Sequence, residues 1–433
     1  MRLILLLMAG FAFWFGQTAC SGSKKTAFSA TIINPVDAKM PVTDSFMRNI
    51  LAAYPQHFGK ILESPEAVNV QVIYTQINRD KNNRPSFAHR FFNLNADQYF
   101  YPASTVKMPV AVLALQRINE LKVEGLSLNT TMITEAANEK LTTVVNDPTT
   151  SDGRPTIAHY IKKIFLASDN DAFNRLYEFL GQEYINNSLH KMGYDSVQIV
   201  HRLSLPVSEE ENRIANEVKF YDADANLIYQ KPLHKSSLKY HDKTIFLGAG
   251  YYSADKLVAA PFDFSRKNRL NLTDLHSMLT AIVFPEAVEE KQRFNLTQND
   301  YDFLYRHMSM MPKESVYPQY DSSYTDAYVK FLLFGGGGSI ENKSLRIFNK
   351  VGDAYGFLTD AAYIVDFANG VEFLLSATIY CNSDGILNDD KYDYDSVGFP
   401  FMKNLGRVIY DHELKRKKVF LPDLSRFKFQ YGQ

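Results

Sequence analysis

Residues 99–121 read YFYPASTVKMPVAVLALQRINEL and decide the fold of this chain. The run VAVLAL at 110–115 leaves no polar face. A helix that is apolar all round must be buried on most of its sides. We therefore expect this helix in the interior of the fold, with YFYPAST at 99–105 leading into it.

Segments with strand periodicity lie on both sides of that helix in the sequence. Residues 67–76 and 86–94 are expected to form a hairpin around a polar turn. Three more strands are expected at 346–351, 360–367 and 371–380, before a closing helix at 400–414. Helical spacing marks 44–63, 154–166, 172–191, 272–284 and 298–310. This order predicts an α/β (α+β) fold in which one sheet is interrupted by a helical domain.

The same patterns suggest domain boundaries. The sheet domain is expected at 44–110 and 330–433, and the helical domain at 111–329. At about 213–268 the pattern changes, because EVKFYD-ADAN-LIYQ predicts a hairpin followed by polar loops. We interpret this stretch as an atypical insertion within the helical domain.

Residues 1–19 have the features of an export signal, with a basic residue, an apolar run and small residues before Cys20. A cysteine at this point resembles a bacterial lipoprotein signal, in which the thiol is lipidated. Residues 20–43 are small and polar, as suits a lipidated tether. The resemblance implies an exported protein of the cell envelope or periplasm, anchored to a membrane (expected to be the outer membrane) through lipid on Cys20 only. The alternative is ordinary signal cleavage, with Cys20 unmodified.

Composition excludes several classes of function. The chain has 47 basic and 48 acidic side chains and a formal net charge of −1, so no overall field favours nucleic acid. Its 2 cysteines cannot build a disulfide framework or a cysteine metal site, and its 10 histidines include no H-E-x-x-H motif. We expect no metal, no cofactor and no nucleic-acid partner.

Ser104 and Lys107 form an S-x-x-K motif at the start of the buried helix. The S-x-x-K spacing occurs six times in the chain, and only this occurrence opens a long buried helix. Residues i and i+3 share a helix face, so the Lys107 amine can lie against the Ser104 hydroxyl. A desolvated lysine can serve as the base that a serine nucleophile needs, and a helix start favours an oxyanion. The alternative is that Ser104 only caps the helix.

Ser168, Asp169 and Asn170 form the one S-D-N sequence of the chain, directly after a predicted helix. A hydroxyl at such a connection can relay a proton, and a side-chain amide can bind a substrate amide. The alternative is a cap for the following helix, and Asp169 is expected to have that structural role.

Lys350, Val351 and Gly352 form a K-x-G sequence at the end of the predicted strand RIFNKV. A strand lysine beside the pocket would help to keep Lys107 neutral. Gly352 permits close approach of a substrate backbone, and the N–H of Asp353 is a candidate second oxyanion donor, beside the N–H of the serine nucleophile. The alternative is an ordinary strand end.

These three motifs, in this order, resemble the penicillin-recognising serine enzymes, which are class A β-lactamases and penicillin-binding D,D-peptidases. The surrounding residues agree in YPASTVK (101–107), DGRPTIAHYIKKIFLASDNDAFNRL (152–176) and KVGDAYGFLTDAAYIV (350–365). The resemblance implies a β-lactamase/transpeptidase-like fold, with an antiparallel sheet flanked by N- and C-terminal helices and an inserted all-helical domain.

The resemblance also implies a role for each motif residue. Ser104 is expected to be the acylated nucleophile, and Lys107 its base. Ser168 is expected to shuttle a proton, and Asn170 to contact the substrate. Lys350 is expected to set the electrostatic potential of the pocket.

Two positions depart from the family pattern. Val351 stands where the family has serine or threonine, whose hydroxyl binds the substrate carboxylate. Glu209, Glu210 and Glu211 lie where the family has its deacylating glutamate, but their spacing to the next asparagine does not match. Each of the three is a candidate deacylation base, and the alternative is a solvated acidic turn.

Three functions remain open from the sequence. The first is an acyl-serine hydrolase that opens β-lactam-type cyclic amides through Ser104. The second is a D,D-peptidase or transpeptidase on peptidoglycan stem peptides, which suits a site without a deacylating base. The third is a catalytically degenerate envelope lipoprotein that binds its ligand without turnover.

Overall fold

The computed structural model describes residues 41–432. The expected export signal, Cys20 and nearly all of the expected tether lie outside the described residues. No helix among the described residues is long and apolar enough to cross a bilayer.

A five-stranded antiparallel sheet forms the centre of the molecule, with strand order β12-β13-β14-β1-β2. Its strands are β1 (Gln71–Arg79), β2 (Pro85–Phe92), β12 (Leu345–Ala354), β13 (Phe357–Asp366) and β14 (Val371–Tyr380). β13 is buried at every position, because helices cover both faces of the sheet. The predicted hairpin and the three late strands are therefore present, and the early and late parts of the chain meet where β1 pairs with β14.

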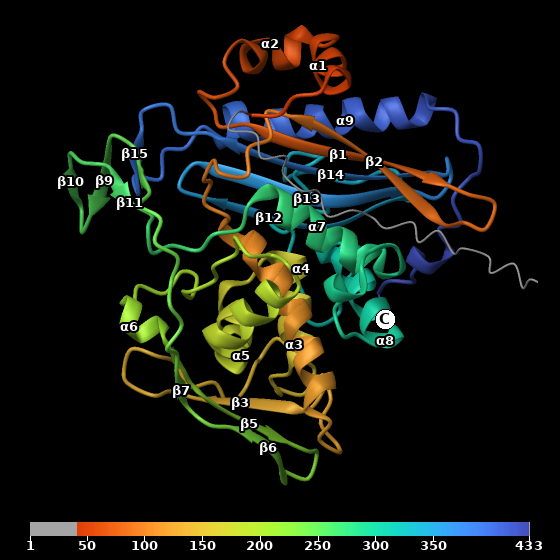
Figure 1. Cartoon of the computed structure of the whole chain (residues 1–433). Helices are drawn as coiled ribbons and strands as arrows, with labels where there is room; N and C mark the ends of the chain where they lie inside the picture. Colours follow the sequence, from red (N-terminus) through yellow and green to blue (C-terminus); the bar gives the residue numbers. More distant parts are fainter. Residues whose placement is uncertain (1–40, 433) are drawn as a thin grey trace, which may run out of the picture.

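Helices lie on both sides of this sheet. They are α1 (Ser45–Ala52), α2 (Pro55–Glu63), α3 (Lys107–Leu121), α4 (Ile157–Ala167), α5 (Asn170–Lys191), α6 (Glu209–Asn212), α7 (Leu272–Val283), α8 (Gln298–Ser309) and α9 (Phe399–Lys415). Figure 1 shows α1, α2 and α9 on one side of the sheet, and α3, α4, α5, α7 and α8 on the other. The predicted architecture of an antiparallel sheet flanked by N- and C-terminal helices is confirmed.

The first helical segment differs from the expectation of one continuous helix over 44–63. Asp44 caps α1 by accepting the N–H of Met47 at 2.7 Å, and α1 ends at Ala52. α2 then begins at Pro55. Proline fits the first turn of a helix but not its interior, so the chain breaks into two helices there.

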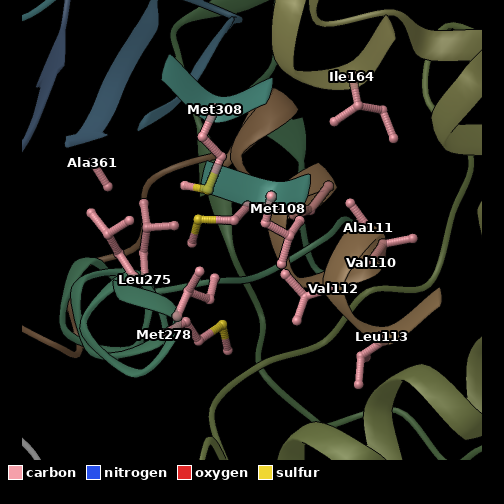
Figure 2. Packing of buried hydrophobic residues seen from close by; sticks show 14 of the residues in the cluster. Met108, Val110, Ala111, Val112, Leu113, Ile164, Leu275, Met278, Met308 and Ala361 are labelled. Carbon is pink, nitrogen blue, oxygen red and sulfur yellow. The ribbon is translucent and has the colours of Figure 1, made fainter. Parts of the chain in front are cut away.

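α3 runs through the larger hydrophobic core, as its apolar sequence predicts. Every residue from 107 to 116 is buried. Figure 2 shows Met108, Val110 and Leu113 within a cluster that also includes Leu275 of α7 and Met308 of α8. Burying a side chain of this size contributes about 1.5–3 kcal/mol, so the packing fixes the N-terminal end of α3 firmly against the sheet.

The inserted region also contains short strands, beyond the hairpin expected there. The short strands of the molecule are β3 (Thr131–Glu135), β4 (Ile214–Ala215), β5 (Glu217–Tyr221), β6 (Leu227–Lys231), β7 (His234–Lys235), β8 (Phe246–Leu247), β9 (Gly250–Ser253), β10 (Lys256–Val258), β11 (Phe262–Asp263) and β15 (Ile386–Leu387). The predicted β5–β6 hairpin pairs with β3 and closes the helical layer opposite the large sheet. Strands β8 to β11 lie where polar loops were expected, and β9 pairs with β15 from the late part of the chain.

Candidate active site

The S-x-x-K residues meet as the sequence predicts. A short 3₁₀ helix, η1 (Ala103–Val106), leads into α3, and Ala103 has a φ of +46°, which is uncommon for a residue with a side chain. This turn places Ser104 one helical turn before Lys107. The two side chains meet with Lys107 Nζ 2.8 Å from Ser104 Oγ, and Lys107 is 0% exposed.

The S-D-N segment lies against the same lysine. Ser168 ends α4 with a left-handed φ of +56°, and Asp169 caps α5 by accepting the N–H of Ala172 at 2.7 Å. Lys107 Nζ donates to Asn170 Oδ1 at 2.7 Å and to the backbone carbonyl of Ser168, and it lies 3.3 Å from Ser168 Oγ. The segment therefore caps a helix and also faces the candidate nucleophile.

Strand β12 brings the third motif to this cluster. Lys350 Nζ donates to Ser168 Oγ at 2.8 Å, so the Ser168 hydroxyl lies between two lysines. A Cβ on Gly352 would lie 2.6 Å from Pro102 O and 2.9 Å from Ser104 N. The close neighbour of Gly352 is thus the backbone at the start of η1. The expected approach of a substrate backbone to Gly352 stays a prediction.

The pKa values of both lysines are lowered. Burial lowers the pKa of Lys107 well below its ordinary value, and the nearby charge of Lys350 lowers it further, against the carboxylates of Asp169 and Asp353. Burial also lowers the pKa of Lys350, to about 7. The shift at Lys107 favours its neutral amine, which is the form that can accept a proton.

Val351, the middle residue of the K-x-G sequence, has a structural role in the core. Val351 is 2% exposed and packs in the core that includes Leu332 and Leu358. This position therefore places an apolar side chain in the core and offers no hydroxyl to a substrate.

Asp353 lies on β12, an edge strand of the sheet, and an edge strand leaves one row of backbone groups without partners inside the sheet. The expected oxyanion role of the Ser104 and Asp353 N–H groups stays a prediction.

Glu209, Glu210 and Glu211 make up most of the short helix α6, and ion pairs engage their carboxylates. Glu209 lies 3.1 Å from Arg213, Glu210 lies 2.8 Å from Lys235, and Glu211 lies 2.7 Å from Lys140. The hydrogen bond from Lys140 and those from Ser208 lower the pKa of Glu211 to about 2. A paired carboxylate with so low a pKa is a weak base, so this geometry favours the solvated acidic turn.

Ser204 takes a place at the site that the sequence did not indicate. Its Oγ accepts a hydrogen bond from Asn170 Nδ2 at 2.8 Å, and the other end of that amide contacts Lys107. The loop carrying Ser204 is held by Arg202, which donates to Glu178 at 2.9 Å and to the carbonyl of Ile214 at 2.7 Å. A serine 34 positions beyond Asn170 in sequence gives no motif, so only the folded loop reveals the contact.

Family comparison agrees with the fold. The sequence model described as the Beta-lactamase enzyme family matches residues 60–412. The chain therefore belongs to the β-lactamase enzyme family. No match was found among curated protein sequences.

Solved structures of similar proteins include β-lactamases and a penicillin-binding protein. The TLA-1 extended-spectrum β-lactamase is 15% identical, with a TM-score of 0.48, covering 85% of this chain and 99% of that one. PBP-A is 16% identical, with a TM-score of 0.46 and coverage of 86% and 98%. A β-lactamase from Sphaerobacter thermophilus is 13% identical, with a TM-score of 0.43 and coverage of 83% and 97%.

Proposed function

We propose that this protein is a serine acyl-transfer enzyme in which Ser104 attacks β-lactam-type cyclic amides. The observation that carries this proposal is the buried Lys107 amine, whose Nζ lies 2.8 Å from Ser104 Oγ. A neutral amine has two N–H groups, and two acceptors stand beside it, namely the Ser168 carbonyl and Asn170 Oδ1. The lone pair is then left for the Ser104 hydroxyl, so Lys107 can act as its base.

The proposed reaction follows from these contacts. Lys107 takes the proton of Ser104 as Oγ attacks the carbonyl carbon, and the amide C–N bond then breaks to leave an acyl ester on Ser104. The leaving nitrogen needs a proton, which Ser168 can supply while its oxygen receives the proton that Lys107 took from Ser104, because the Ser168 hydroxyl contacts both Lys107 and Lys350. The charge of Lys350 also stabilises negative charge near the site.

A second candidate function is a D,D-peptidase or transpeptidase on peptidoglycan stem peptides. The observation that favours it is the neutral Ser204 hydroxyl beside Asn170, together with the ion pairs that engage all three glutamates of α6. Without a free carboxylate to activate water, an acyl ester on Ser104 is expected to persist. A long-lived acyl ester can be transferred to an amine instead of water.

The two functions are separated by their products. We would incubate the full chain in detergent with benzylpenicillin, and separately with a peptide ending in D-Ala-D-Ala, and quantify penicilloate and released D-alanine. Slow penicilloate formation with release of D-alanine is expected for the peptidase, and rapid penicilloate formation for the β-lactamase. Binding of penicillin without either product, unchanged in Ser104→Ala, would instead support the binding lipoprotein and contradict the proposal.

We further propose that the protein acts in the cell envelope, anchored through lipid on Cys20. The sequence of residues 1–20 supports this proposal. A site for amides of the cell wall would then stand on the side of the membrane where those amides occur.

A further inference from the structure

A cleft lies against the Asn170 side of the candidate active site. Its volume is about 570 Å³, and it lies between the loop at residues 200–212 and residues 263–267 of the insertion. Three of its lining residues connect it to the candidate active site. Ser204 contacts the Asn170 amide, Tyr101 lies three positions before Ser104, and Tyr355 lies just beyond Asp353 on the hairpin after β12.

The insertion forms an aromatic wall at this point. Phe264 is 0% exposed and its ring lies 5.3 Å from that of Tyr355, while Phe262 stacks on the same tyrosine at 5.8 Å. Tyr101 meets Tyr355 edge-on at 5.0 Å. Tyr355 has a left-handed φ of +54°, which costs a tyrosine energy and persists only where surrounding contacts impose it. The insertion therefore holds the turn that follows β12 in place.

Most charges around this cleft are engaged by other protein groups. Arg202 is paired with Glu178 at 2.9 Å, and Glu209 with Arg213 at 3.1 Å. Asp263 accepts the N–H of Ser265 at 2.7 Å. Arg266, the other cation of the cleft, lies 3.9 Å from Glu209 and 4.0 Å from Asp242.

Two other titratable groups of the cleft carry no charge near neutral pH. Burial lowers the pKa of His201 to about 4, so this histidine is neutral. Its ring bonds to the carbonyl of Arg202 and to the N–H of Asn268. Burial raises the pKa of Tyr355, so its hydroxyl stays protonated.

Lys267 is the exception. Its ammonium lies 5.5 Å from the centre of the Phe262 ring, and the residue is partly buried. Within residues 41–432 no carboxylate lies within ion-pair distance of Lys267, and its amine makes no hydrogen bond. Burial lowers the pKa of Lys267, and the nearby carboxylate of Asp263 raises it. A charged acceptor that contacts the amine directly would stabilise its ammonium form further.

We infer that the insertion builds a substrate subsite beside Ser104, in which Lys267 binds a carboxylate carried by the acyl part of the amide substrate. This inference rests on the proposed acylation of Ser104. It names the preferred substrate class as acidic acyl donors, such as peptide segments with a free side-chain or α-carboxylate.

The test compares two penicillins that differ by one carboxylate. Carbenicillin is benzylpenicillin with an additional carboxylate on its side chain, and both keep the phenyl ring. The rate of acylation of the full chain is measured by intact mass for each compound. The wild-type protein is expected to react faster with carbenicillin. Lys267→Gln is expected to lower the carbenicillin rate about tenfold and leave the benzylpenicillin rate within about twofold.

Two matched variants complete the design. Lys267→Arg keeps the charge and is expected to retain the preference for carbenicillin. Lys256→Gln removes an exposed lysine on β10 of the same insertion, outside the cleft, and is expected to change neither rate. The benzylpenicillin rate of Lys267→Gln also reports whether that variant is folded.

Two further outcomes would contradict different parts of the proposal. Equal rates for both penicillins in the wild type, or an equal loss for both in Lys267→Gln, would overturn the subsite while leaving acylation of Ser104 intact. Absence of both an adduct and penicilloate in the wild type would overturn the proposed function itself, and the subsite with it.

Discussion

Lys107 and Lys350 lie on either side of the Ser168 hydroxyl, and their charges are coupled through this short distance. Two ammonium groups so close cannot both be protonated without cost, and Lys107 has a pKa that burial and the charge of Lys350 both lower. The consequence is a division of roles at neutral pH. Lys107 is suited to accept the serine proton, and Lys350 to supply positive potential.

This division predicts a pH effect. The rate of acylation should rise with pH as Lys107 loses its proton. Because the charge of Lys350 lowers the pKa of Lys107, Lys350→Met raises that pKa and moves the acid limb of the profile to higher pH, by about one unit. On the acid limb of the profile, acylation then becomes about tenfold slower. The measurement is the rate of penicillin adduct formation from pH 5 to 10.

Two controls accompany this prediction. Lys350→Arg keeps the charge and should leave the acid limb near its original position. Lys417→Met removes an exposed lysine at the end of the chain and should change nothing. A uniform loss of rate in Lys350→Met, with an unshifted acid limb, would show that Lys350 does not act on Lys107 through its charge.

Some residues of the candidate site can be predicted from the sequence, because a short spacing along the chain is enough to bring them together. Ser104 and Lys107 share one helix face, so their spacing alone brings them together. Ser204 could not be predicted in the same way, because its contact with Asn170 depends on the loop that the buried Arg202–Glu178 pair holds. The sequence made the glutamates of α6 candidate deacylation bases, but in the structure each of them lies in an ion pair.

At the scale of elements, the site depends on how closely β12 approaches η1. Gly352 allows this approach, since a side chain there would meet the backbone of η1 at Pro102 and Ser104. These are backbone atoms at the start of a helix whose core is fully packed, so they have little room to move. The strand therefore positions the nucleophile directly.

Gly352→Ala tests this contact. The added methyl group must push η1 away from β12, which should destabilise the protein by about 1–3 kcal/mol. The displacement of Ser104 should slow acylation by about 100-fold. Thermal unfolding and adduct formation are measured side by side. Gly337→Ala is the matched control, because no atom lies within 4 Å of its added Cβ.

An unchanged acylation rate in Gly352→Ala would show that η1 can shift without moving Ser104, and the account of this contact would be wrong. A loss of similar size in Gly337→Ala would show that the effect is not specific to β12.

Most elements follow from periodicity, and the exceptions have identifiable causes. The late strands and α3 have strong patterns and lie close to their expected positions. The expected helix over 44–63 is interrupted because Pro55 begins a new helix. Strands β8 to β11 are two to four residues long, too short for an alternating pattern to be recognised, and they depend on contacts with distant parts of the chain such as β15.

At the scale of the whole molecule, the sheet and the helical layer meet at the candidate site. η1 with the first residue of α3, the α4–α5 connection and β12 each contribute one motif. Long stretches of chain separate these three segments in the sequence. The family match over residues 60–412 includes all three of these segments. The insertion adds a wall of aromatic residues beside it.

Anchoring of the whole molecule is predicted through Cys20. Cells expressing the full chain and fed labelled palmitate should incorporate label into the wild-type protein, because a lipoprotein cysteine is acylated after export. Cys20→Ser should abolish that label. Cys381→Ser is the control, since this buried cysteine cannot serve as an anchor. Label that persists in Cys20→Ser would contradict the lipid anchor.

The central claim is that Ser104 becomes acylated, and intact-mass spectrometry tests it most directly. The full chain and its Ser104→Ala variant are incubated with benzylpenicillin and sampled over time. We predict a wild-type adduct of one penicillin mass that persists after free penicillin is removed, and no adduct on Ser104→Ala. An adduct of equal yield on Ser104→Ala, or neither an adduct nor penicilloate from the wild type, would contradict the account.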